Sequence, residues 1–205
     1  MVVVMKIEIV NSGNVALIQE VIRVHNLAFS NRETKGKKNP YTPINEEEFL
    51  KMLNNSNAYM YAMVQDDSVQ GAVCCTYENE NGNKICGISH VCVNPEQQRK
   101  GIARRLLNYA EEQAIQSNCQ MMRLNVGSIW EPAVNLYTSL GFLKHGIVAH
   151  VPGTYYLIRM VKILAPYSVP VWKQKATFLY SRIKFAVLFH KDSTPNTLHR
   201  IIYKK

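Results

Sequence analysis

Three β-rich runs of residues, joined by short polar connections, fill the chain from residue 58 to residue 93 and restrict its fold more than any other feature. Only four polar residues separate the first run, 58–64, from the second, 69–77, and a connection of that length is typical of a hairpin. A second polar turn leads into the third run, 84–93, which Pro95 stops because proline cannot donate to a strand ladder. The pattern predicts an antiparallel meander.

Helical patterns lie on both sides of this meander. Leu17, Val21 and Val24 have helical spacing, and Asn45 followed by three glutamates is typical of a capped helix start. The expected order is a strand near the N-terminus, helices over 15–29 and 45–53, the meander, a helix over 101–117, a strand over 121–126, a helix over 132–140, and strands over 142–151 and 155–161. This order predicts a mixed α+β fold with helices on both faces of a sheet.

Composition indicates a folded globular protein. Hydrophobic residues make up 47% of the 205 residues and charged residues 19%, which is unlike a disordered chain. The five cysteines form no C-x-x-C pair and no zinc pattern with histidine, so we expect reduced thiols and no metal. The N-terminus lacks the features of a signal peptide, and the apolar run 185–189 is too short to span a membrane. We therefore expect a soluble, cytoplasmic protein.

The net charge of +9 is concentrated at the C-terminal end. The segment from Ile163 onward carries +7, and the first 162 residues carry +2. Residues 171–191 fit a helix with two apolar stripes, which favours packing on the same domain or on a second copy in a homodimer. An arm for nucleic acid or another polyanion is the alternative, although no known nucleic-acid-binding motif is evident.

Residues 91–104 combine the end of a strand, a polar loop and the start of a helix. The first N–H groups of a helix have no partner within it and lie at the positive end of its dipole. Gly101 lets a bulky anion approach the main chain, and Arg99, Lys100 and Arg104 add positive charge. The segment is a candidate phosphate site, although many helices begin in this way without binding a ligand.

Two short motifs resemble those of the GNAT N-acetyltransferase superfamily. Gln98-x-x-Gly101-x-Ala103, after Val91-x-Val93, resembles the family's cofactor signature. A second block resembles the family's fifth strand and the helix after it, and its matching residues are Leu124, Val126, Ala133, Leu136, Tyr137, Gly141 and Phe142.

The resemblance covers about residues 5–162 and implies a GNAT-like fold. That fold is a mostly antiparallel, splayed mixed sheet with helices on both faces. We accordingly expect residues 1–162 to form an N-acetyltransferase domain and residues 163–205 to form a basic C-terminal extension.

The resemblance also implies acetyl-CoA as the co-substrate. The main chain of Val91, Cys92 and Val93 would pair with the pantetheine arm as a neighbouring strand does, and the N–H of Val93 would polarise the acetyl carbonyl. The amides from Arg99 to Arg104 would hold the pyrophosphate. The implied cofactor-binding residues are Val91, Cys92, Val93, Gln98, Arg99, Lys100, Gly101, Ile102, Ala103, Arg104, Trp130 and Tyr137.

Tyr137 matches the tyrosine that protonates the departing CoA thiolate in many relatives, and it is the one catalytic residue that the resemblance implies. Trp130 stands where many relatives have an asparagine that helps to hold the cofactor. Its ring either stacks on the cofactor or covers the core, and we expect the second.

The general base is open. Gly87 and Ser89 occupy the fourth-strand positions that often carry a carboxylate in relatives. His90 titrates in a useful range, but alternation along a strand turns it away from a cleft that Ser89 faces. A water chain is one alternative, and the reserve candidates are Glu78, Glu80, His145 and His150.

The sequence therefore predicts an N-acetyltransferase that moves the acetyl group of acetyl-CoA to a primary amine by direct attack. The alternative is a non-catalytic acyl-CoA-binding or nucleic-acid-associated module with the same fold, which the missing carboxylate favours slightly. The sequence does not choose between a small molecule and a protein as the amine-bearing acceptor. We expect the loops 31–43 and 149–155 to shape the acceptor pocket.

Overall fold

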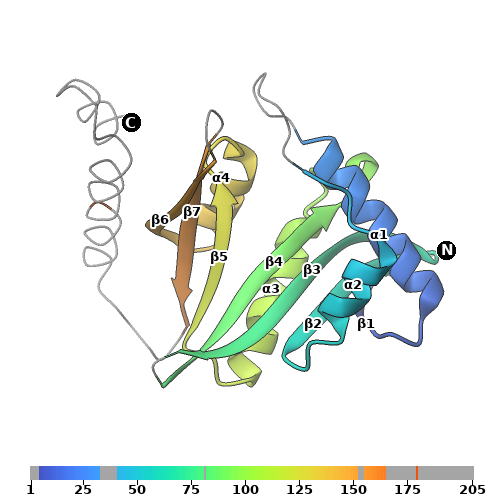
Figure 1. Ribbon diagram of the computed structural model, residues 1–205, viewed down its shortest axis with the longest axis horizontal. Helices are drawn as coiled ribbons and strands as arrows, with labels where there is room; N and C mark the ends of the chain where they lie inside the picture. The colour runs from blue at the N-terminus through green and yellow to red at the C-terminus, as the bar shows by residue number, and fades with distance from the viewer. Residues whose placement is uncertain (1–4, 33–40, 81, 152–154, 165–178, 180–205) are drawn as a thin grey trace. The chain divides into compact units, whose positions relative to one another are not determined.

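The predicted meander is present in the computed structural model, which describes residues 5–32, 41–80, 82–151, 155–164 and 179 (Figure 1). Strands β2 (Ala58–Gln65), β3 (Ser68–Glu80) and β4 (Asn83–Val93) pair antiparallel in succession. Strand β1 (Lys6–Val10) pairs antiparallel with β2. These strands belong to the first of two units of the chain, which comprises Met1–Met122.

Three helices cover the sheet of the first unit. Helices α1 (Val15–Ser30) and α2 (Glu46–Leu53) are capped by Asn14 and Asn45, whose side chains accept hydrogen bonds from the first turn. They lie on one face, where their buried residues share a core with alternate residues of the strands. This core consists of Val10, Ile18, Val21, Val24, Ala28, Phe49, Met60, Ala62, Val64, Val69, Ala72, Cys74 and Cys92.

Helix α3 (Ile102–Gln116) covers the opposite face. Tyr61, whose neighbours in β2 belong to the first core, lies edge-on to Tyr109 of α3 with 5.1 Å between ring centroids. Side chains alternate between the faces of a strand, so this contact places α3 on the side away from α1 and α2. The expected helices on both faces are confirmed.

The second unit, Arg123–Lys205, contains most of β5 (Met121–Gly127) together with α4 (Glu131–Ser139), β6 (Leu143–Val151) and β7 (Tyr155–Ile163). Strand β7 lies between β5 and β6 and pairs antiparallel with β6. Gly141 ends the turn after α4 with a φ of +89°, as expected of a glycine just past a helix.

The order of helices and strands agrees with the prediction, and the fold class is confirmed as mixed α/β with mostly antiparallel strands. The sequence missed one short element, the 3-10 helix η1 (Pro95–Gln97). All five cysteines are buried free thiols. None of the described helices is long and apolar enough to cross a membrane. The predicted extension from residue 163 lies outside the described residues apart from residues 163, 164 and 179.

The close approach of strand and helix at Gly71 gives a test of this packing. A Cβ atom on Gly71 would lie 2.6 Å from the carbonyl oxygen of Cys92 and 3.1 Å from Ile102 Cγ2. A backbone oxygen cannot rotate away, so we expect Gly71→Ala to lower the free energy of unfolding by about 1–3 kcal/mol. Urea denaturation of the purified protein measures this change.

Gly87→Ala in β4 is the matched control, because a Cβ atom there meets nothing closer than 3.5 Å. We expect its free energy of unfolding to stay within about 0.5 kcal/mol of the wild-type value. Equal stabilities of the two variants would contradict the described packing of α3 on β3.

Candidate functional site

The loop between β4 and α3 has the backbone of an anion-binding site. Gln98 is extended, Arg99 is left-handed with a φ of +63°, and Gly101 is left-handed with a φ of +79°. Gly101 is the N-cap residue of α3, and no side chain caps the helix there. Left-handed residues ahead of an uncapped helix gather backbone N–H groups into a concavity that suits a phosphate.

The surroundings of this loop suit a pyrophosphate in both charge and space. Gln98, Arg99, Lys100 and Arg104 are exposed, whereas Ile102 is buried and fixes the start of the helix in the core. A Cβ atom on Gly101 would meet no atom within 4 Å, so the space beside the main chain is open. The φ of residue 101 favours glycine, and the open space is what an approaching anion needs.

The end of β4 contains an irregularity that the sequence analysis did not foresee. Ala72 pairs with Cys92, and Cys74 pairs with Ser89. Between these pairs, β3 has one residue, Val73, and β4 has two, His90 and Val91. This β-bulge gives His90 a φ of +50°, which is uncommon for a residue other than glycine. Strict alternation therefore does not hold at this point.

The bulge corrects the expected orientation of His90. Ser89 pairs with Cys74, which belongs to the core on the α1 side, and paired residues of an antiparallel ladder share a face. His90 also points to α1, because its Nδ1 lies 3.0 Å from Nε2 of His25. The expectation that Ser89 and His90 face opposite sides of the sheet is wrong, because β4 is not a regular strand at this point.

His25 and His90 belong to a connected polar chain on the α1 side of the sheet. His25 is buried with 2% of its surface exposed, and its Nδ1 lies 3.0 Å from the Tyr41 hydroxyl. Tyr41 donates a hydrogen bond to Asn26 Oδ1, which also accepts from the backbone N–H of Ile44 at 3.1 Å. Sequence reasoning missed this chain because its members are far apart in sequence. The one available signal was a histidine at position 25 within the apolar stripe of a helix.

Burial keeps both histidines neutral. Burial, with the charge of His90 second, lowers the pKa of His25 to about 4. Burial also lowers the pKa of His90 below its usual value. Both imidazoles are therefore unprotonated at neutral pH, when each carries a single N–H.

The remaining strand residues of the predicted cofactor site differ in what they expose. Cys92 is 3% exposed and packs in the core, and burial raises the pKa of its thiol to about 12, so its side chain is structural. The carbonyl of Val91 accepts a hydrogen bond from Arg32 Nη2 at 3.5 Å. The N–H of Asn94 donates to Gln70 O at 2.9 Å, which ties the start of the loop to β3.

Trp130 and Tyr137 lie in the second unit, Trp130 at the N-cap of α4 and Tyr137 in its last turn. Tyr137 is 8% exposed, and its ring is edge-on to Phe142 at 6.0 Å. The Trp130 ring packs against Gly127, where a Cβ atom would lie 2.6 Å from it, and 4.9 Å from the ring of Tyr155. The side chain is half-buried, and whether it also contacts the cofactor stays a prediction.

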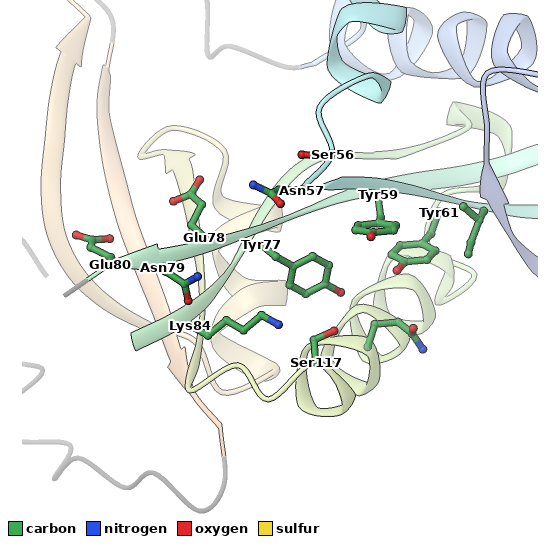
Figure 2. Close-up of a pocket in the computed structure, with 12 residues that line it drawn as sticks. Ser56, Asn57, Tyr59, Tyr61, Tyr77, Glu78, Asn79, Glu80, Lys84 and Ser117 are labelled. Atoms are coloured by element: carbon green, nitrogen blue, oxygen red, sulfur yellow. The ribbon is translucent and has the colours of Figure 1, made fainter. Parts of the chain in front are cut away.

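A pocket of about 900 Å³ lies elsewhere in the first unit (Figure 2). Tyr59, Tyr61 and Tyr77 line one side of it, with Gln113 and Ser117 at the C-terminal end of α3. Because α3 has 15 residues, its two ends are about 20 Å apart, so this pocket is not the anion site at Gly101.

Glu78 and Glu80, two of the reserve bases, line this distal pocket and not the bulge. His145 lies in β6, where burial and the charge of Arg159 lower its pKa. The side chain of His150 lies outside the described part of the chain. Of the residues considered as a base, His90 alone lies at the bulge beside the predicted cofactor strand.

Comparisons with known proteins show the family and the fold. The sequence model of the acetyltransferase (GNAT) family matches residues 21–142. A streptothricin acetyltransferase of Escherichia coli is 24% identical over 140 residues, which are 68% of this chain and 77% of that protein.

Two solved structures show the same fold. One is the ribosomal-protein-S18-alanine N-acetyltransferase from Escherichia coli, with a TM-score of 0.64, 16% identity, and coverage of 82% of this chain and 99% of that chain. The other is a chain of the NatC complex bound to Gag peptide and CoA, with a TM-score of 0.62, 15% identity, and coverage of 78% and 99%.

The buried histidine pair predicts how stability depends on pH. A histidine whose pKa is depressed on folding binds fewer protons in the folded state than in the unfolded state. Stability is therefore lost as pH falls from 6.5 towards 4, by up to about 1.4 kcal/mol per pH unit for His25. We expect the stability of His25→Gln to depend less steeply on pH than that of the wild-type protein. Part of the pH dependence should remain, because the pKa of His90 is also lowered. Urea unfolding at a series of pH values measures the slope, and an unchanged slope in the variant would show that His25 is not the titrating group.

Proposed function

We propose that this chain, which belongs to the GNAT acetyltransferase family, transfers the acetyl group of acetyl-CoA to a primary amine. The observation that carries the proposal is the loop before α3. Its residues match the family's cofactor signature, and its backbone has a left-handed glycine, an uncapped helix start and exposed cationic side chains. Each of these features favours the pyrophosphate of CoA, and one of the structural relatives has CoA bound.

Each part of the proposed cofactor site has a distinct task. The N–H groups from Arg99 to Arg104 hold the pyrophosphate, with Gln98 at the entrance of the loop. The main chain of Val91 to Val93 pairs with the pantetheine arm, and the N–H of Val93 donates to the acetyl oxygen. The buried thiol of Cys92 supports this assignment, because only its main chain is left to face a ligand.

Acetyl-CoA supplies an activated acetyl group in the form of a thioester. The amine reaches this group as the neutral base, because an ammonium nitrogen has no lone pair for the attack. Tyr137 provides a proton or a hydrogen bond to the departing sulfur, the role that the family resemblance implies for it.

The relatives indicate which amines to test. Streptothricin, the alanine of ribosomal protein S18 and a Gag peptide are named for the three similar proteins, and each is a compound in which an amine can be tested. The purified full-length chain would be incubated with acetyl-CoA and each of streptothricin, an alanine-initiated peptide and free lysine, with release of the CoA thiol recorded. Acetylation of at least one amine is the expected result. Binding of acetyl-CoA without transfer to any amine would instead favour a non-catalytic module.

The anion site predicts a specific effect of charge at position 101. We expect acetyl-CoA to raise the melting temperature of the wild-type protein, since a ligand of the folded state stabilises by about 2.7 kcal/mol at a hundredfold excess over its dissociation constant. Gly101→Glu should abolish this rise, because it places a negative charge where the pyrophosphate binds. Differential scanning fluorimetry measures both.

Gly101→Ala is the matched control. Both variants force a side chain into the left-handed conformation at φ +79°, at a cost of about 1–2 kcal/mol, but the alanine adds no charge. We expect the alanine variant to keep most of the acetyl-CoA shift. An equal shift in a folded glutamate variant would exclude this loop as the cofactor site.

The proposed acid predicts a kinetic effect without a binding effect. Tyr137→Phe keeps the ring that packs on Phe142 and removes the hydroxyl. We expect kcat to fall about 100- to 10,000-fold, the range for a positioned acid, with an unchanged melting temperature and acetyl-CoA shift. Full activity in this variant would leave solvent as the acid.

A further inference from the structure

We propose that His90 is the general base of the transfer, and that His25 and Tyr41 are positioning residues that hold it in the tautomer whose lone pair is on Nε2. The inference rests on the proposed acetyl transfer. It is carried by the hydrogen-bonded chain from His90 through His25 and Tyr41 to Asn26, and by the β-bulge that turns His90 towards that chain.

The direction of every proton in this chain follows from its end at Ile44. The backbone N–H of Ile44 donates to the Asn26 side chain at 3.1 Å, and the Ile44 carbonyl accepts from it at 3.0 Å, so the Asn26 amide has a fixed orientation. Tyr41 has one hydroxyl proton and donates it to Asn26 Oδ1. The Tyr41 oxygen is therefore the acceptor for His25 Nδ1–H across 3.0 Å.

The tautomer of His90 follows from that of His25. A neutral His25 that donates from Nδ1 has a lone pair on Nε2, and that atom lies 3.0 Å from His90 Nδ1. His90 must supply the proton of this hydrogen bond, so its single N–H is on Nδ1. The lone pair of His90 is consequently on Nε2, the ring nitrogen that does not bond to His25.

His90 also has the access that a base needs. Its side chain is only partly buried, in contrast to His25, and among the described residues Nε2 has no hydrogen-bond partner. It stands three residues before Val93, on the strand whose main chain is proposed to hold the pantetheine arm. Its left-handed φ of +50° is the kind of strained backbone that persists where surrounding contacts fix it, often at functional sites.

The amine nitrogen forms a bond to the acetyl carbon, and the carbon–sulfur bond breaks with its electron pair left on sulfur. The nitrogen loses one proton to Nε2 of His90, which becomes an imidazolium that still donates from Nδ1 to His25. Tyr137 or solvent protonates the sulfur. Before the next turnover His90 gives its proton to water, and a Tyr137 that has acted as the acid regains one from water.

The charges around His90 favour its unprotonated form between turnovers. His25 is affected by His90 and by the guanidinium of Arg32, which also stacks on Phe29 at 3.6 Å. Tyr41, the next member of the chain, is affected by Arg32, the Cys92 thiol and Glu48. The positive charge of Arg32 and burial both oppose a lasting proton on the pair. His90 is therefore available as a base at neutral pH and returns its proton readily.

The first arm of the test needs no substrate. Long-range ¹H–¹⁵N correlation spectra of the full-length protein at pH 7 report which nitrogen of each histidine carries the proton. We expect both His25 and His90 to carry the proton on Nδ1. In Tyr41→Phe, which lacks the hydroxyl that accepts from His25 Nδ1, we expect part of the His25 population to carry it on Nε2. A His90 protonated on Nε2 in the wild-type protein would overturn the proposal.

The second arm is kinetic and uses the best amine of the panel. His90→Asn keeps a residue type that tolerates the left-handed conformation but cannot accept the proton. We expect kcat/KM to fall about 100- to 10,000-fold, with the acetyl-CoA melting shift unchanged. The wild-type enzyme should lose activity at acid pH as its histidine base becomes protonated, and burial moves that loss below the usual histidine range. The residual rate of His90→Asn should not show this loss. His145→Asn, which alters another partly buried histidine in β6, is the control and should retain activity.

The outcomes separate this proposal from the proposed function. Normal activity of His90→Asn would overturn the role of His90 while leaving acetyl transfer intact. A wild-type chain that acetylates no amine would overturn both the proposed function and the base, even if the spectra confirm the hydrogen-bonded chain. A reduced rate in Tyr41→Phe together with an altered His25 tautomer would support the positioning role, because a purely structural loss would not change the tautomer.

Discussion

The β-bulge in β4 is the feature on which the rest of the candidate site depends. Two residues of β4, His90 and Val91, stand opposite the single residue Val73 of β3. The alternation of side chains between the two faces of the sheet is therefore shifted by one residue after the bulge. This change brings Cys92 into the core while His90 meets α1. Without the extra residue, regular alternation would not allow both a closed core and a histidine chain on the same side of the sheet.

The bulge is followed by a loop whose conformation depends on the same packing. Gly71 of β3 lies against both Cys92 and the first turn of α3, so the end of β4 and the start of α3 are fixed to one another through β3. The helix start next to this contact has a left-handed Gly101 as its N-cap and no side-chain cap on its N–H groups. A neutral histidine chain and a cationic loop thus lie at opposite ends of a short stretch of sequence, and the two suit proton transfer and anion binding respectively.

Much of the fold could be predicted from the sequence, because the signals were local. Alternating strands, the capping residue Asn45 and the glycine after α4 each specify their element within a few residues. The loop before α3 was located from local signals too, and its role as the cofactor site stays a prediction. The bulge and the histidine chain were not, since they depend on register between strands and on contact between His25 and His90, which are 65 residues apart. Alternation, applied as a rule, gave the wrong orientation for His90 at the one position where the ladder is irregular.

Hydrogen–deuterium exchange of the full-length protein with and without acetyl-CoA tests the central claim most directly, because it locates the ligand without requiring a known acceptor. The account predicts slower exchange of the amides in residues 99–104 and at the end of β4, since these N–H groups would bind the pyrophosphate and the pantetheine arm. Slower exchange confined to the distal pocket around Tyr59 and Tyr77, with residues 99–104 unchanged, would contradict it.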